Sequence, residues 1–450
     1  MTASRLGQKE FSRRRRQLLR MIGRGGAAVL PAAPVRLRNR DVEYPYRQDS
    51  DFYYLTGFAE PDAVAVLIPG RGHAEYILFC RERDPARETW DGPRAGQEGA
   101  VAHYGADDAF PIDDIDDILP GLLESCERVY HTMGIHPEFD SRVIGWVNTL
   151  RNRGGGAQVP QEFVSLDHLL HDMRLFKSRS EQAAMRRSAK IGVAAHLRAM
   201  RSVRPGMMEY QVEAEFLHEF RRHGAEPSYQ PIVGAGGNAC VLHYIANDAR
   251  LEDGDLLLID AGCELDYYAC DITRTMPVNG RFSEVQRAIY DIVLEAHQAA
   301  IAQVQPGNHW NDPHDAAVRA VTRGLKRLGL LEGTLATLIR DEACKRFFMH
   351  KTGHWLGMDV HDVGDYRVEE HARQLEPGMV MTIEPGIYIP DGLRGVPKRW
   401  RGIGVRIEDD VVVTRDGHEV LTDGVPVDPD EIEAVMAAGR AAGSSAGQAA

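Results

Sequence analysis

A repeated segment in the carboxyl-terminal part of the chain constrains its fold more than any other feature. Gly254 to Gly262 has the sequence GDLLLIDAG, and 124 residues later Gly378 to Gly386 has the sequence GMVMTIEPG. Each copy is an apolar, strand-like run that ends in a carboxylate before a small-residue turn. Each is also preceded by a capping-box pair, a helix, a V-x-P-G turn and a second helix, with the boxes at Ser178 to Glu181 and Ser283 to Gln286. This duplication predicts a pseudo-twofold α+β domain with a curved antiparallel sheet and outer helices.

The length of the chain and the position of these signals predict three regions. At 450 residues the chain is too long for one ordinary domain. Before the first capping box, short apolar runs such as AVAVLIP and AEYILFC alternate with acidic helical stretches, which is typical of an α/β domain. We therefore expect an amino-terminal α/β domain over residues 1–176, an α+β catalytic domain over 177–435, and a low-complexity tail over 436–450.

The composition argues against several classes of partner. The formal charge of −13 is unfavourable for binding nucleic acid or an anionic membrane surface, because both attract basic proteins. No apolar run reaches the roughly 18 to 20 residues that cross a bilayer. The basic run Arg13 to Arg16 lacks the uninterrupted apolar stretch of a signal peptide, so we expect a solvated first helix. Six cysteines without a CxxC pair indicate a reducing compartment, and we expect a cytoplasmic protein.

Five side chains are the strongest candidates for a catalytic centre. They are four carboxylates and one imidazole: Asp260, Asp271, His354, Glu384 and Glu408. Asp260 and Glu384 end the two repeated runs, where a lone charge is costly unless it is paired or bound to metal. Asp271 opens the β-branched stretch DITRTM, so a hairpin can return it to Asp260. Arg406 and Glu408 are two residues apart in GVRIEDDVVV, and in a strand they share one face.

This set of side chains predicts a two-metal hydrolytic site. Each carboxylate taken alone is explained more simply as a turn cap or a surface ion pair, since most charged residues are solvated. Together, hard oxygen ligands and one imidazole suit Mn²⁺, Mg²⁺, Fe²⁺ or Co²⁺, and would also accept Zn²⁺. Two cations that share carboxylate bridges activate a water and polarise a carbonyl, which is the chemistry of amide hydrolysis. Histidines also gather near these segments, and we expect at least two of them to face the substrate: His243, His350, His354 and His361.

The motifs resemble those of the aminopeptidase P family of metal-dependent pita-bread peptidases. The resemblance covers nearly the whole chain and rests on the segments EYPYRQDSDFYYLTGFAEPDAV, MRLFKS, LIDAGCELDYYACDITRTMPVNGRF, HWLGMDVHDVG, LEPGMVMTIEPGIYI and RGIGVRIEDDVVV. It implies an amino-terminal domain of the creatinase type and a pita-bread catalytic domain with duplicated halves. It also implies that all five candidates bind two divalent metals, with Mn²⁺ expected and Co²⁺, Fe²⁺ or Zn²⁺ as alternatives. Asp271 and Glu408 are then expected to bridge the metals.

The resemblance further implies roles for the side chains around the metals. Glu384 is expected to shuttle the proton of a hydroxide that bridges the two metals. His361 and His243 are expected near the substrate carbonyl and the scissile nitrogen, and His350 is expected to line the prolyl pocket. Arg406 matches an arginine that braces the carboxylates in the family.

Substrate and assembly follow from the same resemblance. The expected activity is removal of an amino-terminal residue from peptides with proline second. A bond before proline is a tertiary amide without an N–H, which suits a metal site that needs no hydrogen bond from that nitrogen. Trp90, in ETWDGPRAG, matches a tryptophan that reaches a neighbouring subunit's active site in tetrameric members, which implies a homo-oligomer, either a tetramer or a dimer. Arg373 is the candidate for a further substrate-binding arginine.

Alternatives to this activity stay open. A prolidase, which cleaves only Xaa-Pro dipeptides, would use the same five ligands, so the ligands do not discriminate between the two. Creatinase-like hydrolases and non-enzymatic peptide-binding proteins share the fold, but both are expected to lose ligands. This chain has all five, and function resides in the site rather than in the fold.

Overall fold

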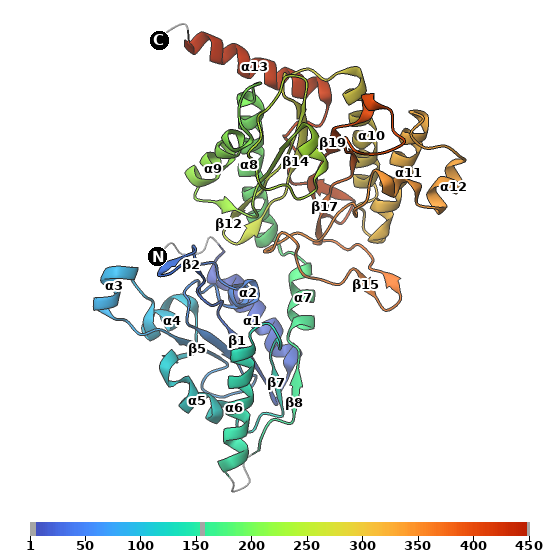
Figure 1. Ribbon diagram of the computed structural model, residues 1–450. Helices are drawn as coiled ribbons and strands as arrows, with labels where there is room; N and C mark the ends of the chain where they lie inside the picture. The colour runs from blue at the N-terminus through green and yellow to red at the C-terminus, as the bar shows by residue number, and fades with distance from the viewer. Residues whose placement is uncertain (1–5, 154–157, 448–450) are drawn as a thin grey trace. The chain divides into compact units, whose positions relative to one another are not determined.

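The computed structural model describes residues 6–153 and 158–447 (Figure 1). The chain divides into two compact units, Met1–Met173 and Arg174–Ala450. The helix α7 (Asp167–Leu175) contains the boundary between them, close to the boundary expected after residue 176. Within the described residues, none of the helices has the length and apolar character needed to span a membrane.

The amino-terminal unit is built on a six-stranded mixed sheet with the strand order β6-β5-β4-β1-β7-β8 (Figure 1). The strand β4 pairs antiparallel with β1 and β5, and the other neighbours pair parallel. Apolar strand residues such as Val29, Val66 and Phe79 share one core with helix residues such as Leu119 and Trp146. The predicted α/β architecture of this region is therefore confirmed.

The elements of this unit are short, as expected for an α/β domain with many connections. The sheet strands are β1 (Gly26–Pro31), β4 (Val64–Leu67), β5 (Tyr76–Cys80), β6 (Asp108–Pro111), β7 (Arg128–Tyr130) and β8 (Glu162–Val164). A separate hairpin consists of β2 (Leu37–Asn39) and β3 (Val42–Glu43). The helices besides α7 are α1 (Gln8–Ile22), α2 (Ser50–Thr56), α3 (Pro85–Asp91), α4 (Gly96–Tyr104), α5 (Ile115–Leu123) and α6 (Pro137–Arg153).

The basic run in α1 is not the solvated surface that the sequence predicted. Arg14 and Arg15 are buried, and each donates a hydrogen bond to a backbone carbonyl of α2. The acceptors are the carbonyls of Tyr54, at 3.0 Å, and Leu55, at 2.8 Å. Carbonyls in the last turn of a helix have no partner within the helix and favour cations, so these arginines stabilise the end of α2. The prediction is wrong at these two positions because it considered α1 without its packing partner.

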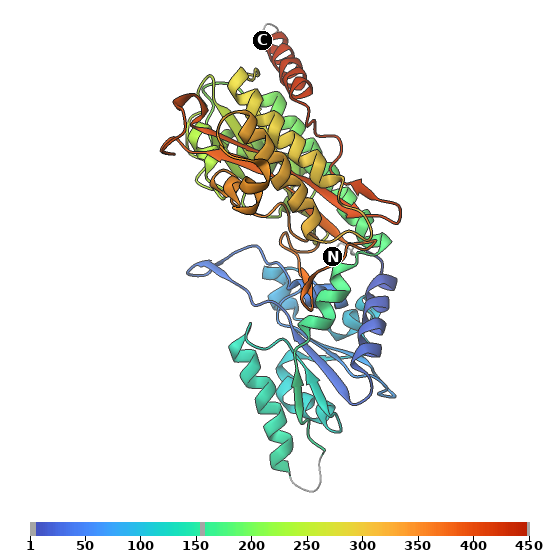
Figure 2. The same ribbon diagram turned by 90° about the vertical axis from the view of Figure 1, so that its right-hand side faces the viewer.

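The second unit repeats one arrangement of helices and antiparallel strands. A helix pair opens each half: α8 packs against α9 in the first half, and α10 packs against α11 in the second. The helices α10 and α11 lie side by side in Figure 2. The first half contains the antiparallel sheet β10-β11-β14, and the second contains the antiparallel sheets β17-β20-β21 and β18-β19. Both predicted capping boxes are present, at the starts of α8 and α10. The duplicated α+β architecture read from the repeat is confirmed.

The bounds of these elements place the repeated strands at equivalent positions. The main helices are α8 (Arg179–Ser202), α9 (Glu209–Arg222), α10 (Glu284–Ile301) and α11 (Asn311–Arg327). The strands named above are β10 (Ile232–Ala235), β11 (Leu256–Asp260), β14 (Thr273–Pro277), β17 (Val380–Ile383), β18 (Gly386–Ile389), β19 (Ile403–Arg406), β20 (Asp409–Val413) and β21 (His418–Val420). Smaller elements are β9 (Glu226–Pro227), β12 (Cys263–Leu265), β13 (Tyr268–Ala269), α12 (Leu335–Arg340), β15 (Arg367–Val368) and β16 (His371–Ala372).

The carboxyl-terminal segment is helical. The helix α13 (Pro429–Gly447) extends into residues 436–450, which the sequence analysis treated as a separate low-complexity tail. Alanine favours helix, and α13 also packs against α8. The last three residues of the predicted tail, 448–450, lie outside the described residues.

Candidate metal centre

The fold brings the predicted ligands to the place where the two halves of the second unit meet. Asp260 is the last residue of β11 and Glu384 directly follows β17, so each repeated strand delivers one carboxylate. Asp271 lies two residues before β14, which returns antiparallel to β11. The predicted hairpin between Asp260 and Asp271 is therefore confirmed. Glu408 comes from the other half and is joined to this hairpin, because its N–H donates to the carbonyl of Thr273 at 3.0 Å.

Arg406 and Glu408 reach the centre differently from the prediction, which placed both on one face of one strand. The strand β19 ends at Arg406 and β20 begins at Asp409, so Glu408 lies in the break between strands of two different sheets. Both side chains are nevertheless buried, with 4% and 2% of their surface exposed. The prediction that both residues lie in one strand is therefore wrong, but both side chains contact the hydroxyl of Thr273 and so reach the same point.

Three of the five candidate ligands form a tight group. Asp271, His354 and Glu408 each offer a ligand atom, and these atoms lie within 4.8 Å of one another. The Nε2 atom of His354 lies 3.5 Å from a carboxylate oxygen of Asp271 and 3.7 Å from one of Glu384. Glu384 therefore lies beside the group, because its carboxylate and that of Asp271 face the same nitrogen of His354.

The fifth candidate, Asp260, is connected to the group by two other side chains. The hydroxyl of Tyr229 contacts the carboxylates of both Asp260 and Asp271. Arg406 donates from Nη2 to Asp260 at 2.6 Å. These contacts hold Asp260 at the edge of the cluster and orient its carboxylate, as the bracing role expected of Arg406 requires.

The hydroxyls of Thr273 and Tyr229 bind candidate ligands, and the sequence analysis did not identify either residue. The hydroxyl of Thr273 donates to Glu408 at 2.6 Å and accepts from Nε of Arg406 at 3.1 Å. The spacing of Thr273 to Asp271, two residues apart in DITRT, is a signal that could have found it. Tyr229 lies 31 residues before Asp260 and carries no comparable signal, because only the tertiary fold brings the two together.

The hydrogen bonding of His354 suits a metal ligand. Its Nδ1–H donates to the backbone carbonyl of Trp355 at 2.9 Å. Since a carbonyl can only accept, this bond places the proton on Nδ1 and leaves the lone pair of neutral His354 on Nε2, the atom that faces Asp271 and Glu384. Burial opposes protonation of His354, yet Asp271 and Glu384 raise its pKa to about 9. The same negative charges that favour a proton on His354 would also favour a cation beside Nε2.

The carboxylates repel one another, which is the strongest sign that the cluster fits cations. Burial raises the pKa of Glu408 well above its usual range, and the charges of Asp271 and Glu384 add to the effect. Burial also raises the pKa of Glu384 to about 7, against the opposing charges of His354 and Arg406. One guanidinium and one protonated imidazole cannot offset four carboxylates in a buried cluster. Divalent cations would remove this repulsion, so the side chains present fit the two metals that the ligand set predicts.

Three more histidines lie around the cluster. The rings of His354 and His361 are nearly perpendicular, with 4.4 Å between their centres. His350 binds the hydroxyl of Tyr388 through Nε2 at 2.9 Å, and burial lowers its pKa to about 3. The side chain of His243 is exposed, and a charge on it would add to the lowering of the pKa of both His350 and His361. Two of the predicted substrate histidines therefore lie next to candidate ligands, since His350 Nδ1 is 3.8 Å from Glu384 and the ring of His361 contacts that of His354.

Two family models match the chain. The model of metallopeptidase family M24 matches residues 183–415, and the model of the aminopeptidase P N-terminal domain matches residues 11–130. The chain belongs to metallopeptidase family M24. Within this M24 chain the matched range contains all five candidate ligands, and the second model marks it as a member of the aminopeptidase P group.

Relatives of this M24 chain match it over almost its whole length. Xaa-Pro aminopeptidase of Escherichia coli (strain K12) is 48% identical over 443 residues, which covers 97% of this chain and 99% of the relative. The structure of Pseudomonas aeruginosa aminopeptidase PepP is 61% identical, with a TM-score of 0.96, and covers 97% of this chain and all of its own. A variant of E. coli aminopeptidase P, solved in complex with substrate, is 47% identical, with a TM-score of 0.94 and coverages of 97% and 99%. The expected pita-bread catalytic domain and separate amino-terminal domain are confirmed by these matches.

Two predicted substrate-binding residues of the M24 chain lie outside the cluster just described. Trp90 is on α3 of the amino-terminal unit and is 86% exposed. The guanidinium of Arg373 lies 5.7 Å from the centre of the Phe176 ring. Both roles remain predictions, because neither placement involves the candidate ligands.

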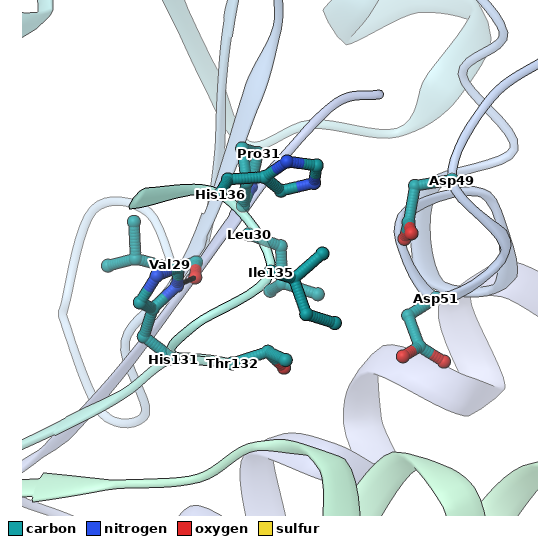
Figure 3. Close-up of a pocket in the computed structure, with 9 residues that line it drawn as sticks. All are labelled: Val29, Leu30, Pro31, Asp49, Asp51, His131, Thr132, Ile135 and His136. Atoms are coloured by element: carbon teal, nitrogen blue, oxygen red, sulfur yellow. Dashed lines mark hydrogen bonds between the residues drawn. The ribbon is translucent and has the colours of Figure 1, made fainter. Parts of the chain in front are cut away.

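The M24 chain has a second group of metal-type side chains, in its amino-terminal unit. Asp51, Asp167 and His171 offer atoms within 4.8 Å of one another. Asp51 also lines a small pocket, where Figure 3 shows Asp49 and Asp51 on one side and Ile135 and His136 on the other. Asp167 is hydrogen-bonded by Thr132, and His171 lies 3.7 Å from Asp51. Ordinary ion pairing and hydrogen bonding explain this group, and we assign it no metal.

Proposed function

We propose that this protein removes the amino-terminal residue from peptides that have proline in the second position. We further propose that it does so with two divalent cations, Mn²⁺ in the first instance, held by Asp260, Asp271, His354, Glu384 and Glu408. The observation that carries this proposal is the convergence of Asp271, His354 and Glu408 within 4.8 Å, in a chain that is 48% identical to an Xaa-Pro aminopeptidase over 443 residues.

Each side chain of the cluster has a part in this scheme. Two bound cations would make a water acidic enough to attack and would polarise the substrate carbonyl. Glu384 is placed for proton transfer, since one carboxylate oxygen is 3.7 Å from His354 Nε2 and the other is 3.8 Å from His350 Nδ1. It can accept the proton of the attacking water at one oxygen and deliver it toward the leaving nitrogen. Arg406 holds the Asp260 carboxylate in a fixed direction during both steps.

We place the substrate beside the histidines that lie next to Glu384 and His354. His361 and His243 would bind the substrate carbonyl and the region of the scissile nitrogen, and neutral His350 would line the pocket for the proline ring. A pyrrolidine ring is apolar and carries no N–H, so the face of a neutral imidazole suits it better than a charged group.

The proposed assembly is a homo-oligomer, either a dimer or a tetramer, in which Trp90 contacts a second copy. Tryptophan is enriched among the residues that dominate binding at protein interfaces, and the side chain of Trp90 is 86% exposed. We also retain a cytoplasmic location as a proposal, because the six cysteines are all free thiols in the structure.

The length of the substrate gives the first test. We expect turnover of a tripeptide of the form Gly-Pro-Xaa with release of free glycine, measured by chromatography after loading with Mn²⁺. Peptides in which alanine replaces proline should be turned over at least about tenfold more slowly, a difference of 1.4 kcal/mol in transition-state binding. Turnover restricted to the dipeptide Gly-Pro would instead make the protein a prolidase.

A second test separates substrate binding from metal binding at His361. We expect His361→Ala to lower kcat/KM about 10²- to 10³-fold, the usual loss when one group that stabilises developing charge is removed. The metal content, measured by mass spectrometry of the protein after gel filtration, should stay at the wild-type value. Loss of metal from this variant would mean that His361 is a ligand, and the proposed role would be wrong.

A further inference from the structure

We propose that Asp362 is a positioning residue, which holds His361 at the cluster through a buried ion-pair network with Arg174 and Lys177. The inference rests on the proposed function, because it assigns His361 to the substrate. It concerns two short segments. The His361 loop is residues 357–364, and the junction segment is residues 174–178, which contains part of the motif MRLFKS.

The three charged groups are buried, and Nη2 of Arg174 also donates to Asp359, a partly exposed residue of the same loop, at 2.7 Å. Asp362 accepts from Nζ of Lys177 at 2.8 Å on one carboxylate oxygen, and from Nη2 of Arg174 at 2.6 Å on the other. The three side chains are buried, with between 3% and 6% of their surfaces exposed. Burial alone would raise the pKa of Asp362, but Lys177 and Arg174 hold it below its usual value. The carboxylate is therefore ionised, and both of its oxygens are bound by cations of the junction segment.

The backbone of the His361 loop is built around this carboxylate. The N–H of Asp362 donates to the carbonyl of Trp355 at 2.9 Å, and that of Gly357 donates to the carbonyl of Asp359 at 3.1 Å. A methyl group in place of hydrogen on Gly357 would come within 2.1 Å of an Asp362 oxygen. The loop thus closes tightly on the side chain of Asp362, and its conformation depends on where Arg174 and Lys177 hold that side chain.

His361 depends on this anchor because it is the adjacent residue. Its ring is exposed, while the side chain of Asp362 is buried, so the two point to opposite sides of the loop. Among the described residues, the ring of His361 packs on one other ring, that of His354, in an edge-to-face contact. One such contact leaves much of the ring unsupported, and the direction of the imidazole is then determined mainly by the backbone at residues 361 and 362.

Lys177 also anchors the strand that carries Glu384. Its N–H donates to the carbonyl of Gly378 at 2.8 Å, and Gly378 leads into β17. Gly378 has a φ of 99°, and a side chain there would meet the Lys177 carbonyl at 3.2 Å. One residue of the junction segment therefore contacts both the His361 loop and the base of β17, which fixes the two arms of the site relative to each other.

A role in stability alone is a poor explanation for this network. Burying three charged groups costs desolvation that their attraction only about repays, and apolar replacements of such networks are often as stable. The network does fix the orientation of the Asp362 carboxylate, because a carboxylate bound at both oxygens has little freedom to rotate. A displacement of about 1 Å in a group that contacts substrate can cost about 10²-fold in rate.

The test is a double-mutant cycle between Asp362 and His361. Asp362→Asn keeps the shape but removes the charge, and we expect it to lower kcat about 30- to 100-fold on a tripeptide with proline second. KM and metal content should change little. In a His361→Ala background the same substitution should change kcat by less than about twofold, because its effect acts through the missing imidazole. Equal losses in both backgrounds would overturn the proposal and leave a purely structural role.

Two further variants test whether the loss of kcat is specific to the network. Lys177→Met removes one cation and leaves Arg174 in place, so we expect a smaller loss of kcat, about tenfold, that is again absent without His361. Arg198→Gln is the control, since Arg198 pairs with Glu215 at 2.5 Å between α8 and α9 and, among the described residues, forms no ion pair or side-chain hydrogen bond with the loop. It should leave kcat unchanged.

Hydrogen exchange gives a readout that does not depend on turnover. Asp362→Asn should increase amide exchange in residues 357–364 at least about tenfold, while Arg198→Gln should not. If the wild-type protein failed to cleave proline peptides, the proposed function would be wrong and this measurement would still test the anchor. Unchanged exchange in the loop of Asp362→Asn would overturn the inference even if the protein proved to be an Xaa-Pro aminopeptidase.

Discussion

Asp271→Ala is expected to leave no measurable peptidase activity. Asp271 is buried, takes part in the group with His354 and Glu408, and is the proposed bridge between two cations. Replacing partners of ligands in metal sites costs roughly 10- to 100-fold, so loss of a bridging ligand should exceed about 10³-fold in kcat/KM. The same result is expected for Glu408→Ala. Metal content after Mn²⁺ loading and gel filtration should fall from about two ions per chain to one or none.

The matched control for this experiment lies on the same hairpin. Asp266 is in the turn between β12 and β13 and pairs with Arg187 at 3.1 Å. Its φ of 53° favours Asn over Ala, so Asp266→Asn removes the charge without adding backbone strain. We expect wild-type metal content and activity from this variant. Near-wild-type turnover by Asp271→Ala, after its metal has been stripped and reloaded, would contradict the dinuclear mechanism.

Arg406→Met is expected to destabilise the metal-free protein far more than the metal-loaded protein. Arg406 is buried and donates to Asp260 at 2.6 Å and to the hydroxyl of Tyr388 at 3.0 Å. Removing one partner of a buried ion pair typically costs about 3 to 5 kcal/mol, because it leaves an uncompensated charge. Bound cations would compensate the same carboxylates, so the loss of unfolding free energy should shrink to about 1 to 2 kcal/mol in Mn²⁺.

Urea unfolding in EDTA and in Mn²⁺ measures this difference. Arg15→Met is a suitable control, since Arg15 is also buried but binds a backbone carbonyl, that of Leu55, at 2.8 Å. Its loss of stability should be the same with and without metal. If Arg406→Met behaved like this control, Arg406 would not be balancing the charge of the carboxylate cluster.

Local signals made several parts of the fold predictable. Ser178 and Glu181 form the capping box that the sequence indicated, because a capping box needs only four consecutive residues. Asp260 and Glu384 were placed at strand ends by the apolar runs that precede them, and the structure agrees. Where the prediction depended on a partner far away in the chain, as for the contact of Arg14 with α2, it was wrong.

In the candidate site, too, local features could be predicted and contacts between distant residues could not. Its ligands could be selected from the sequence because carboxylates at the ends of apolar strands are costly unless they are bound or paired. The position of Glu408 could not be predicted, because the break of two residues between β19 and β20 leaves no mark in GVRIEDDVVV, which looks like one continuous strand. Tyr229 and the network of Asp362 were also beyond the sequence, since their contacts join residues many positions apart.

The sequence by itself determined that this protein has two matched halves and a shared set of metal-type side chains, because repeats, capping and burial of charge are written in local patterns. Only the tertiary structure decided how those side chains meet. It placed Glu408 against Thr273, turned the Nε2 atom of His354 toward Asp271, and brought Lys177 to Asp362. The physical reason is that the direction of a buried charged group depends on all the partners around it, and those partners are chosen by the packing of the whole chain.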